Sequence, residues 1–198
     1  MARGKHTREE IRQLAIDVAE QCIVEHGMQG MNARHIAKEM GYAVGTLYQV
    51  FKSMDLLIFE VNMRSLLALE KKLRSAAQDA THCHAAIEAM VMRYVDYALQ
   101  ETNRWQTLFE HRLPEDVELP ETYQKHRAQL FRLLEEQLKC AYPDRLDKDI
   151  ALEARALWAG VHGICTLALL NKLDDDGLNI KDIVQTLLVR FNTVGGEV

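Results

Sequence analysis

The most conspicuous group of reactive side chains is His82-Cys83-His84, whose residue types bind transition metals. Residues one and two apart do not share a face of a helix, and no further cysteine or histidine cluster lies nearby. We therefore interpret residues 79–84 as a surface turn and expect no metal site. The sequence also has no nucleophile paired with a base and no phosphate-binding loop, so we expect neither an enzyme nor a bound cofactor.

A second stretch, residues 32–51 (NARHIAKEMGYAVGTLYQVF), has the spacing of two short helices joined by a tight turn. The first helix is expected at about 33–40 and the second at about 44–51. Gly41 stands between them, where the chain reverses and a left-handed residue is needed, which glycine adopts without strain. A pair of helices this tightly joined is typical of proteins that place the second helix in the major groove of DNA.

The charge distribution is compatible with that use. The net charge is −5, but residues 1–55 carry seven Lys/Arg and seven Asp/Glu, so the remaining residues, with 17 and 22, hold the whole excess. The first eight residues contain Arg3, Lys5 and Arg8 and no acid. A basic tip on an acidic body would bind nucleic acid through the tip alone.

Length and composition favour an all-α protein of one or two domains. The chain has 198 residues, 48% of them hydrophobic, and only three prolines. The hydrophobic pattern predicts about nine helices. Thr7 and Glu10 form a capping box before the first, and Ser53 caps the long fourth helix. The expected helices lie at about 7–27, 33–40, 44–51, 54–78, 85–100, 105–111, 122–141, 148–172 and from 180 onward.

The four cysteines, Cys22, Cys83, Cys140 and Cys165, are scattered and include no CxxC pair. Three of them fall in helical patterns, and we expect these to be small buried hydrophobes. The N-terminus has no signal-peptide pattern, so the reducing cytoplasm is the expected compartment.

The segment 156–170 carries no charge. Fifteen residues are fewer than the roughly 20 that cross a bilayer, so we expect a buried helix and no membrane contact. A helix that is apolar nearly all round must be covered on more than one side, by its own core and by a partner subunit. Gly160 and Gly163 fit close packing of another helix at that point.

Residues 7–60 resemble the DNA-binding domain of the TetR family of bacterial transcription regulators. The capped first helix, the sequences IAKEMGY and GTLYQVF, and Ser53 carry the resemblance. Trp158-Ala-Gly-Val-His162-Gly163 also resembles a Trp–His–Gly motif in the C-terminal domains of one TetR subgroup. The resemblance implies an all-α homodimer. Residues 1–54 would form a three-helix helix-turn-helix domain that binds double-stranded DNA, and residues 55–198 would form a helical body for effector binding and dimerisation through the last two helices.

By position, the resemblance also implies which residues contact DNA. Arg34 would reach a base edge or phosphate, the third helix would supply the reading surface, and Lys52 and the N-terminal arm would contact phosphates or the minor groove. The chemistry agrees, because Arg pairs with guanine, Gln with adenine, and Thr or Val methyls touch thymine. The implied set is Arg3, Lys5, Arg8, Arg34, Val44, Gly45, Thr46, Tyr48, Gln49 and Lys52.

Two positions depart from the family pattern. Ala43 stands where a Ser or Thr cap is common, and the loss of such a cap costs about 1 kcal/mol. Met54 stands where a Lys commonly holds a phosphate, and losing one such contact lowers the salt dependence of binding by about one unit.

Methionine and aromatic residues in the body are candidates for an effector pocket, although such a stripe is also typical of a core. Trp158 and His162 lie four apart on one face of a helix, so they form either a core pair or the border of a pocket or dimer seam. The candidate set is Met63, Met90, Tyr94, Trp105, Phe109, Phe131, Trp158 and His162.

These observations predict a dimeric repressor that binds a palindromic operator and is released by a small apolar effector. The alternative is a TetR-like DNA-binding factor whose body docks a protein partner and has no small-molecule effector.

Overall fold

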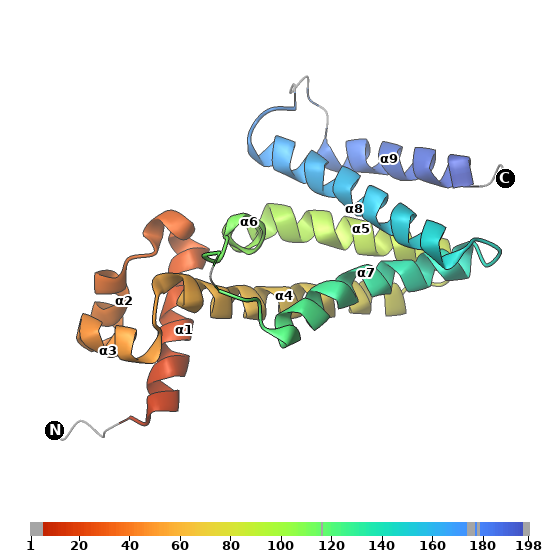
Figure 1. The fold of residues 1–198 in the computed structure, drawn as a ribbon. Helices are drawn as coiled ribbons and strands as arrows, with labels where there is room; N and C mark the ends of the chain where they lie inside the picture. The colour runs from red at the N-terminus through yellow and green to blue at the C-terminus, as the bar shows by residue number, and fades with distance from the viewer. Residues whose placement is uncertain (1–5, 116, 174–176, 178, 196–198) are drawn as a thin grey trace. The chain divides into compact units, whose positions relative to one another are not determined.

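The structure, a computed structural model, describes residues 6–115, 117–173, 177 and 179–195. Within those ranges every regular element is helical: nine α-helices and one short 3-10 helix (Figure 1). This confirms the predicted all-α class with an N-terminal helix-turn-helix.

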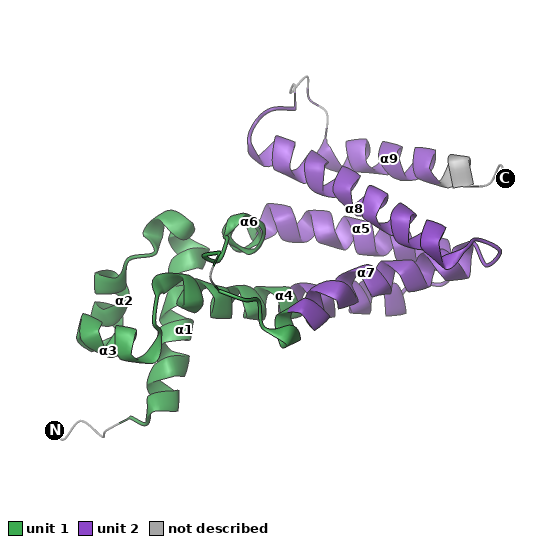
Figure 2. Cartoon of the chain, in the orientation of Figure 1, with its two compact units in different colours: residues 1–67, 101–123 green, residues 68–100, 124–198 purple. Residues whose placement is uncertain are grey.

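The chain divides into two compact units (Figure 2). Unit 1 comprises the described residues up to 67 together with 101–123, and unit 2 comprises 68–100 and the described residues from 124 onward. Helix α4 (Met54–Gln78) is continuous and belongs to unit 1 up to Leu67 and to unit 2 from Ala68. The predicted functional boundary at residue 54 stays a prediction, because compactness alone does not divide DNA binding from effector binding.

Unit 1 opens with α1 (Arg8–His26), which begins at the predicted capping box. The Thr7 hydroxyl accepts the Glu10 N–H, and a Glu10 carboxylate oxygen accepts the Thr7 N–H. A 3-10 turn that the sequence did not predict, η1 (Met28–Gly30), follows Gly27.

Of the two short helices of unit 1, α2 has the predicted bounds and α3 ends one residue before the predicted residue 51. Helix α2 (Ala33–Met40) is capped by the Asn32 side chain, which accepts the N–H groups of Arg34 and His35. It ends at Gly41, whose φ of 72° is the predicted left-handed conformation, and α3 (Val44–Val50) follows.

The core of unit 1 lies where α1, α2, α3 and the start of α4 meet. Its buried members are Ala15, Ile16, Ala19, Ile23, Ile36, Met40, Leu47, Phe51, Leu57 and Val61. Each side chain of this size contributes about 1.5–3 kcal/mol when fully buried, except for the smaller alanines. The two short helices, α2 and α3, are therefore held by a shared core and not by their own helical propensity. The sixth helix, α6 (Thr102–Glu110), also packs on α1.

Unit 2 contains the second part of α4, α5 (Cys83–Gln100), most of α7 (Glu121–Ala141), α8 (Asp147–Leu169) and α9 (Ile180–Gly195). Helices α8 and α9 lie side by side in Figure 1 and pack against each other, and both contact α5. A Cβ built at Gly160 of α8 would lie 3.0 Å from the Leu187 side chain of α9, so glycine permits this close approach. The expectation for Gly160 is confirmed, whereas Gly163 has no such neighbour within 4 Å.

Two expectations about the cysteines and their surroundings were wrong. Helix α5 begins at Cys83, so Cys83 and His84 belong to its first turn and not to a surface turn. Cys140, expected to be a buried hydrophobe, is exposed and forms a disulfide with Cys83. Cys22 and Cys165 are buried free thiols, as expected.

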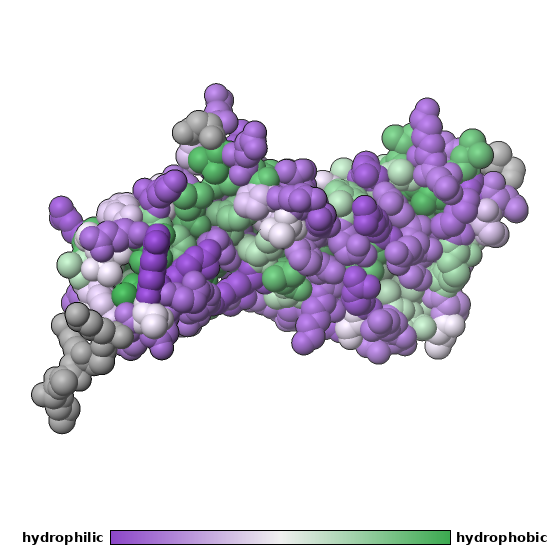
Figure 3. Space-filling model, turned by 60° about the horizontal axis from the view of Figure 1, so that its bottom comes forward, coloured by the Kyte–Doolittle hydropathy of each residue, from purple (hydrophilic) through white to green (hydrophobic). Residues whose placement is uncertain are grey.

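Hydrophilic side chains predominate on the face shown in Figure 3, and hydrophobic ones form smaller patches between them. Among the described helices, none has the length and apolar character that a membrane crossing requires.

Candidate functional site

The outward face of α3 is the best-formed candidate site. Gly45, Tyr48 and Gln49 are exposed on this helix, while Leu47 points into the core and is 1% exposed. Tyr48 is 46% exposed although it is large and aromatic, and a Cβ at Gly45 would meet nothing within 4 Å. The helix therefore presents a bare backbone turn beside an aromatic hydroxyl and an amide, which are groups that contact phosphates and base edges.

Several contacts fix α3 against the rest of unit 1. Leu47 and Phe51 anchor it in the core, and the guanidinium of Arg12 lies 5.4 Å from the centre of the Phe51 ring. At the other side, the Arg8 guanidinium donates a hydrogen bond to the Gln49 carbonyl oxygen at 3.3 Å. An exposed reading face on a firmly anchored helix is the arrangement that sequence recognition needs.

The N-terminus of α3 lacks a side-chain cap. Ala43 has extended backbone angles, φ −75° and ψ 150°, but no side chain that could accept an N–H of the first turn. Only its carbonyl takes part, accepting the Thr46 N–H at 2.9 Å. This confirms that Ala43 leaves the cap missing.

The structure places the predicted DNA-contacting residues as follows. Arg34 and Lys52 are exposed, and Val44 and Thr46 are half-buried at the start of α3. Arg8 is exposed and its guanidinium is hydrogen-bonded to the backbone of α3, so Arg8 contacts the third helix within the protein. Whether any of the set contacts DNA stays a prediction, and Arg3 and Lys5 lie outside the described residues.

A partly buried polar network joins α4 to α6 in unit 1. The Asn62 side chain donates to the Thr107 carbonyl oxygen at 3.2 Å and lies 3.4 Å from His111 Nδ1. His111 Nε2 in turn lies 3.2 Å from a carboxylate oxygen of Asp55. Asn62 is 3% exposed, and its Oδ1 has no partner among the described residues. No role was predicted for these residues from the sequence.

Helix α6 is also fastened to α1. The Arg104 guanidinium lies 2.6 Å from a Glu20 carboxylate oxygen, and the Asn103 side chain donates to the Val24 carbonyl oxygen at 2.9 Å. Glu20 also pairs with Arg64 of α4 at 2.7 Å. Glu20 therefore lies at the centre of an ionic cluster that ties α1, α4 and α6 together within unit 1.

Four of the predicted effector residues form a cluster in unit 2, which we call the aromatic cluster: Tyr94 of α5, Phe131 of α7, and Trp158 and His162 of α8. The Tyr94 hydroxyl is hydrogen-bonded to His162 Nδ1 at 2.7 Å. The rings of Trp158 and His162 stack with centroids 4.9 Å apart, and Phe131 meets Trp158 edge-on at 5.5 Å.

The aromatic cluster is partly sheltered from water. Tyr94 is buried, and Phe131, Trp158 and His162 are half-buried. Burial lowers the pKa of His162 below its ordinary value, because the charged imidazolium loses hydration there. A neutral imidazole and a phenol hydroxyl beside two aromatic rings suit a mostly apolar ligand with one polar group.

The other four predicted effector residues do not join the aromatic cluster. Met63, Trp105 and Phe109 belong to unit 1, where the rings of Trp105 and Phe109 lie 5.4 Å apart, and Met90 is buried in α5. An effector role for them stays a prediction. No group of metal-binding side chains occurs among the residues that the structure describes.

Comparison with known proteins decides the family. The family described as bacterial regulatory proteins, tetR family, matches residues 15–61, and the tetracyclin repressor-like C-terminal domain matches residues 87–191. The chain belongs to the TetR family. The second match includes Trp158, His162 and Gly163, while the Trp–His–Gly subgroup itself stays a prediction.

Individual relatives agree with this TetR assignment. The HTH-type transcriptional regulator SAB2452 of Staphylococcus aureus is 33% identical over 91 residues, which cover 46% of this chain and 47% of that protein. The match thus spans about half the length of this curated relative.

Among solved structures, a protein of unknown function from Rhodococcus sp. RHA1 is similar with a TM-score of 0.76 and 21% identity, covering 96% of this chain and 97% of that one. The transcriptional regulator FadR from Bacillus subtilis, in complex with stearoyl-CoA, has a TM-score of 0.69 and 15% identity, over 90% and 96% of the two chains. At these identities the likeness establishes the shared fold.

Proposed function

We propose that this TetR-family protein is a cytoplasmic, dimeric repressor that binds a palindromic operator and releases it when a small, mostly apolar effector binds. The exposed face of α3, held on a closed helical core, is the observation that carries the proposal. Gln49 would bond to a base edge, with adenine as its natural bidentate partner. Tyr48, Lys52 and Arg34 would contact phosphates and fix the register.

Dimerisation is supported by an apolar stripe on α8. Six residues recur at helical spacing along one face, from the second turn of α8 to the residue after its end, and five of the six are exposed. No charged side chain interrupts the stripe, and Gly163, half-buried at its middle, leaves space for a close approach. Such a surface suits an isologous contact with the same stripe and α9 of a second copy. The α8 stripe consists of Leu152, Ala156, Ala159, Gly163, Leu167 and Leu170.

A dimer would place the two α3 helices in successive major grooves, about 34–36 Å apart. Because the two reading helices would be held by one dimer body, operator affinity depends on their separation. An effector that changes this separation would therefore lower the operator affinity.

The effector would bind at the aromatic cluster of unit 2. Its binding would displace the second part of α4, and because α4 is one continuous helix, the displacement would reach unit 1. The polar network of α4 with α6 and the Glu20 cluster of α1 would carry it to the helix-turn-helix. The effector must bind the DNA-incompetent state more tightly than the competent one for release to occur.

Acyl-CoA thioesters are the first effectors to test, because the similar FadR structure from Bacillus subtilis contains stearoyl-CoA. A series of acyl chain lengths would separate recognition of the apolar chain from recognition of the nucleotide portion. If no small molecule in the series releases DNA while a protein partner does, the docking alternative replaces the effector.

The proposal is tested by gel-shift titration at one salt concentration with an operator selected from random duplexes. Gln49→Ala should weaken operator binding by about 1–3 kcal/mol and relax the preference at one base pair. Gln21→Ala is the matched control, since Gln21 is also exposed on a helix of unit 1 but lies on α1. Equal effects of the two variants would contradict the reading role of α3. Selection of an operator without a palindrome would contradict binding as a dimer.

A further inference from the structure

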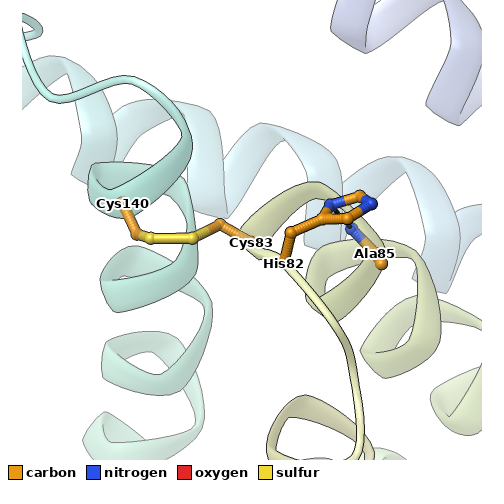
Figure 4. Close-up of a disulfide and its surroundings, with 4 residues drawn as sticks. All are labelled: His82, Cys83, Ala85 and Cys140. Carbon is orange, nitrogen blue, oxygen red and sulfur yellow. Dashed lines mark hydrogen bonds between the residues drawn. A yellow bond between two sulfur atoms is a disulfide. The ribbon is translucent and has the colours of Figure 1, made fainter.

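The two accessible cysteines occupy the ends of two neighbouring helices of unit 2. Cys83 is the first residue of α5, and Cys140 lies in the last turn of α7 (Figure 4). Their Cα atoms are 5.9 Å apart, within the 4.4–6.8 Å range that a disulfide spans, and the two sulfur atoms are bonded. The pair thus links helix ends that are separated by 57 residues of sequence.

A ring contact joins these two helix ends besides the disulfide, and local contacts order each end. The His82 ring caps α5 by accepting the Ala85 N–H at Nδ1, 3.2 Å away. His84, next to Cys83, meets the ring of Tyr142 edge-on at 5.3 Å, just after the end of α7. The Arg145 guanidinium lies 4.1 Å from the centre of the same Tyr142 ring. The His84–Tyr142 contact thus joins the start of α5 to the end of α7 independently of the bond between the two sulfur atoms.

The four cysteines differ in their exposure to solvent. Cys140 is exposed and Cys83 half-buried, whereas Cys22 and Cys165 are buried. Burial raises the pKa of Cys22 and raises that of Cys165 to about 12, so both thiols stay protonated and unreactive. An oxidant in solution therefore meets Cys83 and Cys140 first.

We propose that Cys83 and Cys140 form a redox modification site, closed by hydroperoxides and reopened by thiols, which sets the response of the protein to its effector. Because the effector response belongs to the proposed function, this regulatory consequence rests on it, whereas the chemistry of the pair does not. A DNA-binding regulator works where glutathione keeps thiols reduced, so the pair is open at rest and closes during oxidative stress.

The reaction balances with a hydroperoxide as the two-electron oxidant. The thiolate of one of the two cysteines attacks one oxygen of the peroxide, the O–O bond breaks, and hydroxide leaves as water after protonation, which gives a sulfenic acid. The thiolate of the other cysteine then attacks that sulfur and displaces the second oxygen as water. Two thiols and one molecule of hydrogen peroxide thus yield one disulfide and two molecules of water. A thiol such as glutathione reverses the step by exchange.

Closure would change effector binding because it fastens α5 to α7. These helices carry Tyr94 and Phe131, on different sides of the aromatic cluster. With their ends joined, the two helices cannot separate there to admit a ligand. The oxidised protein should therefore need at least about fivefold more effector to release its operator than the reduced protein, which is the lower end of ordinary allosteric coupling.

The chemical part is tested by treating the full-length reduced protein with hydrogen peroxide and alkylating it under denaturing conditions. The untreated protein should take up four alkyl groups and the treated protein two. Tryptic peptides 75–93 and 140–145 should appear joined in the treated sample and separate again after reduction. Modification of all four thiols in the treated sample, or a disulfide between two copies of the chain, would overturn the proposal.

The regulatory part is tested by gel-shift titration with the effector, on oxidised and reduced protein. Cys83→Ser and Cys140→Ser should each remove the difference, and Cys22→Ser, which leaves the pair intact, should keep it. If the joined peptides form but the effector requirement is the same in both states, the regulatory role is wrong and the redox chemistry remains. If neither state binds DNA, the proposed function fails, and the peptide map still decides the chemistry.

Discussion

The missing cap of α3 gives a prediction whose size follows from the local geometry. Ala43 already has the extended backbone of an N-cap residue, so Ala43→Thr would place a hydroxyl near the Gly45 and Thr46 N–H groups without moving the chain. A hydroxyl cap contributes about 1 kcal/mol over alanine, which corresponds to about a fivefold shift in a local equilibrium.

Hydrogen exchange measures that shift where it occurs. Amides in the first turn of α3 should exchange about fivefold more slowly in the Ala43→Thr variant, while amides of α5 should be unchanged. Ala43→Val is the matched control, because valine has nearly the shape of threonine but cannot accept a hydrogen bond. Equal protection by valine and threonine would refute the capping argument and leave a packing effect in its place.

Three further predictions concern unit 2. Leu167→Glu should convert the dimer to a monomer in sedimentation experiments, because it places a charge in the α8 stripe, whereas Leu67→Glu should not, although Leu67 is equally exposed at 41%. The pKa of His162 is lowered in the folded protein, so at pH values below the ordinary histidine pKa of 6.5 the unfolded chain binds more protons than the folded one. The free energy of unfolding should therefore fall as the pH drops below 6.5. Urea titrations at several pH values should show a smaller fall for His162→Gln. Closing the disulfide should raise the free energy of unfolding by about 4 kcal/mol, because it closes a loop of 57 residues in the unfolded chain. Urea titration of oxidised and reduced protein measures this difference, and equal stabilities would contradict formation of the disulfide.

Local signals in the sequence predicted the fold well. The capping box at Thr7, the glycine at position 41 and the helical spacing of apolar residues depend on neighbours within a few positions. Such signals act through backbone hydrogen bonds and one buried face. For this reason α2 and α4 begin and end at the predicted residues, α1 is one residue shorter than predicted at each end, and α3 ends one residue early.

Features that depend on distant parts of the chain could not be predicted. Cys83 and Cys140 carry no spacing signal, because their proximity results from how α5 and α7 pack. Asn62 and His111 are joined only because α6 returns to α4. One sign was available, since Asn62 lies within the apolar pattern of α4, and a polar residue in a buried position usually has a hydrogen-bonding partner.

The candidate sites followed the same division. The face of α3 was predictable, because a short helix with one anchoring leucine must expose the opposite side. The aromatic cluster was predicted only in part: the spacing of Trp158 and His162 was visible, but their contacts with Tyr94 and Phe131 come from other helices.

The central claim is that two α3 helices of a dimer read a palindrome. It is tested most directly by the affinity ratio between the selected operator and the same operator with about five base pairs inserted at its centre, which turns the half-sites to opposite faces of the duplex. We expect the insertion to reduce binding to the non-specific level, a loss of about 10³-fold or more at one salt concentration. Unchanged binding after the insertion would contradict it.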